Sequence, residues 1–321
     1  MTTCAVSPNS AALGGLAGAL GVIVAIAAGA AIGLLHHRPK IAQFAPMSNH
    51  DWTEIDDAVR VAHDGEVKIA KLSTEGKNLF PDREKAEALT RENAEAINAL
   101  QDVLFAEGKR ALLVVLQGTD TSGKDGTVRG VFNATGPLGV TVTPFGKPSE
   151  EELDQDYLWR IHKVVPRKGT IGIFNRSHYE DVLVVKVRGF APPDAIEKRY
   201  AQINDFERHL TENGVTILKF MLHISKDVQK ERLQERLDDP TKRWKWNAGD
   251  LEDRKLWPDF QAAYETVLNR CSTEHAPWRV IPADKKWRRN AIVSTIVRGT
   301  LEEMAPHYPT FDWKPADFVI V

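Results

Sequence analysis

The stretch that decides the fold is Ala111–Gly130, ALLVVLQGTDTSGKDGTVRG. Its first six residues form an uninterrupted apolar run, which is typical of a buried strand in a parallel sheet. The pattern G-x-x-x-x-G-K follows from Gly118 to Lys124, and a helix is expected from about Lys124 to Phe132. Strand, glycine-rich loop and helix in this order predict a phosphate-binding loop, in which backbone amides and the helix N-terminus surround phosphate oxygens.

Two acidic residues distinguish this loop from the usual pattern. Asp125 follows the loop lysine, where a Ser or Thr hydroxyl normally helps to hold Mg²⁺. Asp120 lies inside the loop, where a carboxylate repels phosphate unless a cation lies between them. We therefore expect Asp120 to bind Mg²⁺ and to orient or deprotonate the phosphoryl acceptor, with Lys124 on the transferring phosphates. The alternative role for Asp120 is that of a turn residue that accepts from local amides.

Apolar runs and helical patterns alternate along the rest of the chain. Helix 83–105 precedes the first strand, and the alternation then predicts a parallel sheet covered by helices on both faces, with its ligand site at the carboxyl ends of the strands. The expected strands cover 111–116, 140–145, 171–174, 215–222 and 278–281, and the later helices cover 150–164, 193–212, 225–237 and about 287–304.

Polar residues follow the strand at 171–174. Asn175 stands where an acid commonly helps to hold Mg²⁺, and Arg176 has two donors for phosphate oxygens. Glu180 completes a polar cluster with His178, which taken singly is expected to be a structural histidine.

A second basic cluster, TKRWKW, covers 241–246. It predicts either a lid that covers a phosphate chain or a solvated basic face. Lys147 adds a cation near the end of a predicted strand.

Composition excludes several classes of protein. The 42 basic and 44 acidic residues give a net charge of -2, so the chain as a whole has no electrostatic signature of a nucleic-acid-binding protein. The two cysteines, Cys4 and Cys271, are far apart, which argues against a disulfide framework or a zinc site and fits a reducing compartment.

Residues 11–35 form an uncharged apolar run that exceeds the ~20 residues needed to span a bilayer. The basic HHRPK that follows would place the rest of the chain in the cytoplasm. Either 11–35 is a single-span anchor to the inner face of the membrane, or Met47 is the natural start and 1–46 is a non-native extension. We expect residues 47–321 to form the catalytic domain in both cases.

Several motifs occur in one order from about Leu79 to Met304. They are GTDTSGKDGTVR, PSEEELDQDYLWRIHK, FNRSHYEDVLVVKV, RLDDPTKRWKW with DLEDR, and HAPWRVIPADKKW. On these motifs the chain resembles the polyphosphate kinase 2 family, which transfers phosphate between inorganic polyphosphate and nucleotides. The resemblance implies a P-loop kinase-like, three-layer α/β/α fold with a parallel sheet, a helical lid at about 238–257 and an N-terminal helical extension.

The resemblance also implies roles for individual residues. Asp120 would bind Mg²⁺ and activate the acceptor, while Lys124 and Arg176 would stabilise the transferred phosphoryl group. The FNRSHYED motif resembles the subgroup that phosphorylates both nucleoside monophosphates and diphosphates, and the family implies a homo-oligomer, dimeric or tetrameric. The lid residues would be Lys242, Lys245 and Arg254, and phosphate or nucleotide binding is expected of Gly118, Gly123, Gly126, Thr127, Lys147, Asn175 and Glu180.

Two other functions are consistent with parts of this pattern. An ATP-dependent nucleotide kinase of the thymidylate-kinase type would share the architecture and the basic lid. A compact nucleoside pocket lined by aromatic residues would favour that kinase, whereas an open cationic channel would favour polyphosphate. A membrane-tethered nucleotide-binding regulatory protein would bind nucleotide with negligible phosphoryl transfer.

Overall fold

The expected parallel sheet forms the centre of the fold. The computed structural model describes residues 49–320. In this part of the chain, five strands pair in parallel in the order β2-β3-β1-β4-β5. Their bounds are β1 (Ala111–Gln117), β2 (Val140–Pro144), β3 (Ile171–Asn175), β4 (Val215–His223) and β5 (Trp278–Pro282).

The strand order creates a switch point beside β1. The chain leaves β1 toward β2 and β3 on one side and returns to β4 and β5 on the other. All seven residues of β1 are buried, which explains its continuous apolar sequence. Parallel sheets bind ligands at the carboxyl edge where the order reverses. At that edge the chain continues from Gln117 and Asn175 into the two predicted site segments.

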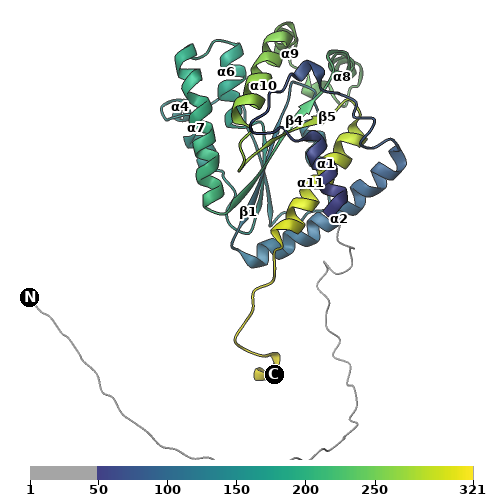
Figure 1. The fold of residues 1–321 in the computed structure, drawn as a ribbon, viewed down its shortest axis with the longest axis vertical. Helices are drawn as coiled ribbons and strands as arrows, with labels where there is room; N and C mark the ends of the chain where they lie inside the picture. Colours follow the sequence, from purple (N-terminus) through teal and green to yellow (C-terminus); the bar gives the residue numbers. More distant parts are fainter. Residues whose placement is uncertain (1–48, 321) are drawn as a thin grey trace, which may run out of the picture. The chain divides into compact units, whose positions relative to one another are not determined.

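Helices cover both faces of the sheet (Figure 1), which confirms the three-layer α/β/α fold. On one face, α2 and α11 bury residues such as Leu104 and Ile296 against the sheet. On the other face, α7 and α10 bury residues such as Ile203 and Leu268. The first face carries α1 (Asn49–Val59), α2 (Arg83–Glu107), α3 (Lys124–Val131) and α11 (Lys286–Met304), and the second carries α6 (Val184–Val187), α7 (Pro193–Glu212) and α10 (Trp257–Cys271).

The predicted helix over 150–164 is wrong. The segment folds as two four-residue helices, α4 (Glu150–Leu153) and α5 (Trp159–His162). Ser149 and Glu152 form a capping box that starts α4. The Asp156 side chain then accepts from the backbone N–H of Leu158 at 2.9 Å. Such a local bond competes with the helical backbone pattern, so the helix is interrupted.

The N-terminal helical extension packs on the outside of α11. Trp52 of α1 is buried, and a Cβ atom built on Gly299 would overlap the Trp52 ring. The glycine therefore lets α1 lie close against α11. Residues 11–35, with the proposed membrane anchor, lie outside the described residues. Within 49–320, none of the helices has the length and apolar character that crossing a bilayer requires.

The lid segment follows α8 at the carboxyl edge of the sheet, where Figure 1 shows α8, α9 and α10 together. Ser225 caps α8 by accepting from Val228 N at 3.2 Å, as the sequence predicts. The lid region contains η4 (Arg243–Lys245) and α9 (Gly249–Lys255) after α8 (Lys226–Asp238), and the remaining short elements are η2 (Ile69–Lys71), η3 (His178–Val182) and η5 (Pro315–Asp317).

Candidate active site

The phosphate loop joins β1 to α3 through backbone angles that favour glycine. Gly118 has φ 149° and Gly123 has φ 102°, and Thr121 between them has φ 62°. A Cβ atom on Gly118 would come within 2.8 Å of the Leu222 carbonyl oxygen. A side chain at Gly123 would collide with Arg289. Glycine is therefore required at both ends of this loop.

Lys124 is buried beneath the loop. Its Nζ donates to the carbonyl of Gly118 at 2.6 Å and to that of Thr119 at 3.3 Å. Burial, helped by the charge of Arg176, lowers the pKa of Lys124 to about 8. A phosphate group bound beside this desolvated ammonium would add negative charge and favour its charged form, so the loop favours anion binding.

Asp120, Arg176 and Glu180 form a charged cluster beside Lys124. Arg176 Nη2 donates to Asp120 Oδ1 at 2.7 Å, and Nη1 lies 3.6 Å from Glu180 Oε2. Arg176 has φ 66°, a left-handed backbone that is uncommon outside glycine. Its N–H donates to Leu116 O at 3.0 Å, which fixes this turn to the end of β1. The structure thus brings together the three residues predicted from two separate motifs.

Asp125 connects the loop to β3 and to the lid. Its carboxylate accepts from Asn175 Nδ2 at 2.8 Å and from Lys245 Nζ at 2.7 Å. Burial alone would raise the pKa of Asp125, but the hydrogen bonds from Lys245 and Asn175 outweigh it and lower the pKa. The residue that replaces the usual hydroxyl therefore holds a lid cation over the phosphate loop.

The other lid residues lie at different depths. Lys242 Nζ contacts Glu235 at 2.5 Å. Arg254 is further back, where it donates to Gln229 Oε1 at 2.9 Å, and Gln229 in turn donates to the backbone carbonyl of Asp120 at 3.3 Å. Lys245 thus contacts the loop directly, Lys242 lines the cavity above the loop while paired with Glu235, and Arg254 reaches the loop through Gln229.

A cavity of about 390 Å³, here called the loop cavity, opens above these groups. A smaller pocket of about 30 Å³ lies on the other side of Asp120 and Arg176, and α10 supplies its aromatic lining. The aromatic side chains of that pocket are Trp257, Phe260 and Tyr264. The loop cavity is lined by Asp120, Gly123, Lys124, Asp125, Gly126, Asn175, Arg176, Arg232, Arg236, Lys242, Lys245, Lys286 and Arg289, among others.

Four predicted binding residues are absent from the lining of the loop cavity. Gly118 and Glu180 line the smaller pocket, and Thr127 and Lys147 line neither. Thr127 is buried, and its hydroxyl donates to the Gly123 carbonyl at 3.1 Å within α3. Lys147 is exposed in the segment after β2. Phosphate or nucleotide binding by these two residues, as by the other predicted binding residues, stays a prediction.

The residues present fit a Mg²⁺ ion brought in by phosphates. Among residues 49–320, no three His, Cys, Asp or Glu side chains gather as a metal cluster. Mg²⁺ usually keeps several waters and takes one or two carboxylates together with substrate phosphates. Asp120 and Asp125 both line the loop cavity, so the donor set is of the right kind.

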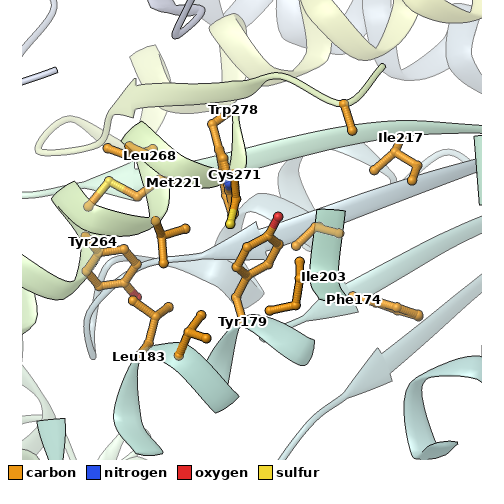
Figure 2. Close-up of a cluster of buried hydrophobic side chains, with 14 of the residues drawn as sticks. Phe174, Tyr179, Leu183, Ile203, Ile217, Met221, Tyr264, Leu268, Cys271 and Trp278 are labelled. Atoms are coloured by element: carbon orange, nitrogen blue, oxygen red, sulfur yellow. The ribbon is translucent and has the colours of Figure 1, made fainter. Parts of the chain in front are cut away.

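A buried polar network supports the turn that carries Arg176. Lys219 Nζ donates to Tyr179 OH at 2.8 Å, to Glu207 Oε2 at 2.5 Å and to Cys271 O at 2.7 Å. Tyr179 OH donates to Glu207 Oε1 at 2.8 Å, and His178 Nε2 lies 3.2 Å from the same oxygen. Figure 2 shows the Tyr179 hydroxyl directed toward Cys271 within the apolar cluster. His178 is therefore the structural histidine that the sequence predicts.

Sequence reasoning missed the two charged members of this network. Lys219 interrupts the apolar strand VTILKFML, which is a signal for a buried cation with a partner. Its partner Glu207 lies in α7 among many exposed acids, and no pattern distinguishes it from them. Burial would raise the pKa of Glu207, but Lys219 and His178 outweigh it and keep the pKa low.

Comparisons with known proteins agree with this geometry. The AMP/ADP-polyphosphate phosphotransferase of Meiothermus ruber is 53% identical over 252 residues, which cover 78% of this chain and 94% of that protein. The ADP-polyphosphate phosphotransferase of Rhodopseudomonas palustris is 38% identical over 266 residues, covering 78% and 91%. The crystal structure of polyphosphate kinase 2 from Arthrobacter aurescens TC1 superposes with a TM-score of 0.79 at 42% identity, covering 82% of this chain and 94% of that one.

The family model for polyphosphate kinase 2 matches residues 81–309, which contain the phosphate loop, the Arg176 turn and the lid. This chain therefore belongs to the polyphosphate kinase 2 family.

Proposed function

We propose that this protein transfers a phosphoryl group between inorganic polyphosphate and nucleotides, with AMP and ADP as acceptors and Mg²⁺ as the metal. The observation that carries the proposal is an acid-containing phosphate loop beneath a cavity whose lining has eight Lys or Arg residues against three Asp or Glu residues. Relatives named for AMP/ADP and ADP phosphotransfer support the choice of acceptors.

In the forward reaction, an oxygen of the acceptor's terminal phosphate forms a bond to the terminal phosphorus of polyphosphate. The bond from that phosphorus to the bridging oxygen breaks, and the shortened chain keeps the electron pair. Lys124 and Arg176 would stabilise the charge on the transferred group. Asp120 would orient the acceptor and hold Mg²⁺, which when bound neutralises charge on the phosphate oxygens.

The ion pair between Arg176 and Asp120 preorganises these roles. The 2.7 Å contact holds the carboxylate at the cavity, and the left-handed Arg176 backbone is fixed to β1. Lys245 lies across the loop on Asp125, so closure of the lid would place further cations over a bound phosphate chain. Water would thereby be excluded, and hydrolysis would be suppressed.

Cavity shapes favour polyphosphate over the ATP-dependent alternative. The aromatic pocket beside Asp120 measures about 30 Å³, whereas the cationic loop cavity measures about 390 Å³ and is open. A large open cationic cavity suits a linear polyanion. A regulatory protein without turnover is disfavoured, because Lys124, Asp120 and Arg176 lie together at the cavity in the roles that phosphoryl transfer would need.

The test is a comparison of donors and acceptors. Purified protein with Mg²⁺ is given long-chain polyphosphate and either AMP or ADP, and the nucleotides are separated by chromatography. We expect ADP and ATP to form. Turnover of ATP with thymidylate or a nucleoside, and none with polyphosphate, would contradict the proposal.

Two further properties belong to this proposal. We propose a homo-oligomer, dimeric or tetrameric, which sedimentation of the purified protein would test. We also propose a cytoplasmic location. Fractionation of cells that express the full chain would test it, and stable association with membranes would instead support an anchor at 11–35.

A further inference from the structure

Gln229 is a buried polar residue that has no part in the mechanism described above. It lies in α8 and is only 2% exposed. A buried glutamine needs hydrogen-bond partners for both ends of its amide. Its Nε2 donates to the backbone carbonyl of Asp120 at 3.3 Å, and its Oε1 accepts from Arg254 Nη1 at 2.9 Å. One amide therefore joins the phosphate loop to the end of the lid helix α9.

The two partners of Gln229 determine which kind of side chain can connect them. The guanidinium of Arg254 has only donors, and the carbonyl of Asp120 only accepts. The residue between them must therefore accept on one side and donate on the other. A glutamine amide does both, whereas a carboxylate has no donor at neutral pH and a methionine has neither group.

Gln229 belongs to a face of α8 that lies between the loop and the lid. Residues 229, 232 and 236 share this face at helical spacing. Arg232 donates to Thr121 O of the loop at 2.9 Å, and Arg236 donates to Asp250 Oδ2 of the lid at 2.7 Å. In the described part of the chain, Gln229 is the member of this face that hydrogen-bonds to both the loop and the lid.

Asp120 is held from two directions at this point. Its carboxylate accepts from Arg176 at 2.7 Å, and its carbonyl accepts from Gln229. The next residue, Thr121, has φ 62°, a left-handed backbone angle that is uncommon outside glycine. Such a backbone persists only where the surrounding contacts hold it. The bond from Gln229 therefore contributes to the position of Asp120 in the loop.

The lid end of the connection is also fixed. Arg254 donates to Lys226 O at 2.6 Å, in the first turn of α8. The adjacent Asp253 accepts from Arg188, which follows α6, at 2.5 Å. A movement of α9 that displaces Arg254 therefore acts on the Gln229 amide and, through it, on the phosphate loop.

We propose that Gln229 is a positioning residue that couples the lid to Asp120. While Arg254 binds the amide oxygen, the amide nitrogen is directed at the Asp120 carbonyl, and the loop acid is held in place. When Arg254 leaves, the amide is free to turn and this support is lost. The inference rests on the proposed function, because the role of Asp120 is part of it. Transfer is thereby favoured while the lid covers the site and excludes water.

The first test is a double-mutant cycle on kcat, with long-chain polyphosphate and ADP as substrates. Gln229→Met has a similar length and removes both hydrogen bonds. We expect kcat to fall about ten-fold and both KM values to stay within about two-fold, because Gln229 positions a group and binds no substrate. In the background of Arg254→Met, the same substitution should lower kcat only about two-fold, since the amide is no longer held there.

Two further variants sharpen this test. Gln229→Glu still accepts from Arg254 but cannot donate to the Asp120 carbonyl, so its kcat should fall as in Gln229→Met. The matched control is Gln101→Met, because Gln101 is also a helical glutamine that is 2% exposed. Gln101 lies against Gly139, next to the amino end of β2 and away from the site. The control should keep the wild-type kcat.

Two kinetic results would overturn the inference. One is a kcat for Gln229→Met equal to that of Gln101→Met. The other is a ten-fold fall that persists in the background of Arg254→Met, because Gln229 would then support the loop without the lid.

Tryptic cleavage of the lid gives a readout that needs no turnover. Trypsin cleaves after Lys and Arg, and Arg243 of the lid is exposed. Without substrate, Gln229→Met and Arg254→Met should each be cleaved in the lid about five-fold faster than wild type, because α9 loses a contact with α8. The double variant should be cleaved no faster than Arg254→Met.

Wild-type cleavage of Gln229→Met would contradict the coupling. A wild-type protein that forms no ATP from polyphosphate and ADP would instead refute the proposed function. The two failures are distinguishable, because the cleavage rates report the contact between Gln229 and Arg254 whether or not the protein turns over.

Discussion

Replacing Lys124 with methionine should stabilise the protein and abolish its turnover. The lysine is buried with carbonyl oxygens as its only hydrogen-bond acceptors among the described residues. Lowering its pKa from 10.5 to about 8 corresponds to a cost of ~3 kcal/mol for keeping the charged form folded at pH 7. The variant loses the two hydrogen bonds, worth ~1 kcal/mol each. We therefore expect a net gain in the free energy of unfolding of about 1–2 kcal/mol.

The pH dependence of this gain follows from the sign of the shift. Below pH 8 the folded and unfolded chains both carry the proton, and the full cost of the buried charge is present. Between pH 8 and 10.5 the folded chain loses the proton while the unfolded chain keeps it, so wild-type stability rises with pH relative to the variant. The advantage of Lys124→Met should therefore shrink as the pH rises through this range.

The assay is urea unfolding of both proteins at pH 7 and at pH 10, with ATP formation from polyphosphate and ADP measured on the same preparations. Other side chains that titrate between pH 7 and pH 10 are the same in both proteins, so their contributions to the stability difference cancel. A variant less stable than wild type at pH 7, or a stability difference independent of pH, would refute the reasoning about the buried charge. Retained turnover would show that the phosphate site is elsewhere.

Three further substitutions test the site and its support. Asp120→Asn should lower kcat about 10²–10³-fold, as losing a preorganised charged group does, and weaken activation in a Mg²⁺ titration; unchanged kcat would contradict its role. Lys219→Met should cost ~3–5 kcal/mol in urea unfolding because it leaves the Glu207 carboxylate buried without its ammonium partner, whereas Lys219→Met/Glu207→Gln should recover most of that loss. Equal losses of unfolding free energy in the single and the double variant would argue against a buried ion pair. Gly299→Ala should cost ~1–3 kcal/mol by pushing the Trp52 ring away from α11, and wild-type stability would show that α1 is not held there.

The sequence predicts the sheet and the loop well because both depend on local patterns. Runs such as 111–116 are short and apolar throughout, as a strand buried on both faces of a parallel sheet requires. The glycines of the loop are required by their own backbone angles. The interrupted helix at 150–164 could not be predicted by hydrophobic spacing, because the side chain of Asp156 decides it by bonding to a nearby backbone N–H.

The sequence predicts which residues belong to the candidate site, but it does not predict which of them contact each other. Asp125 departs visibly from the usual pattern, yet its partner Lys245 lies 120 positions along the chain. Glu207 and Lys219 pair only because α7 packs on β4. Ion pairs of this kind depend on tertiary structure. From the sequence alone, many acidic and basic residues are equally plausible partners for each other. The chemical types of the residues are therefore predictable, whereas their pairing is not.

The most direct test of the central claim is transfer of labelled phosphate. Long-chain polyphosphate carrying ³²P is incubated with unlabelled ADP, Mg²⁺ and the full chain, and the nucleotides are separated. We predict label in the terminal phosphate of ATP with the wild-type protein and none with Lys124→Met. ATP that forms without label, or label released only as free phosphate, would contradict a polyphosphate-dependent nucleotide kinase.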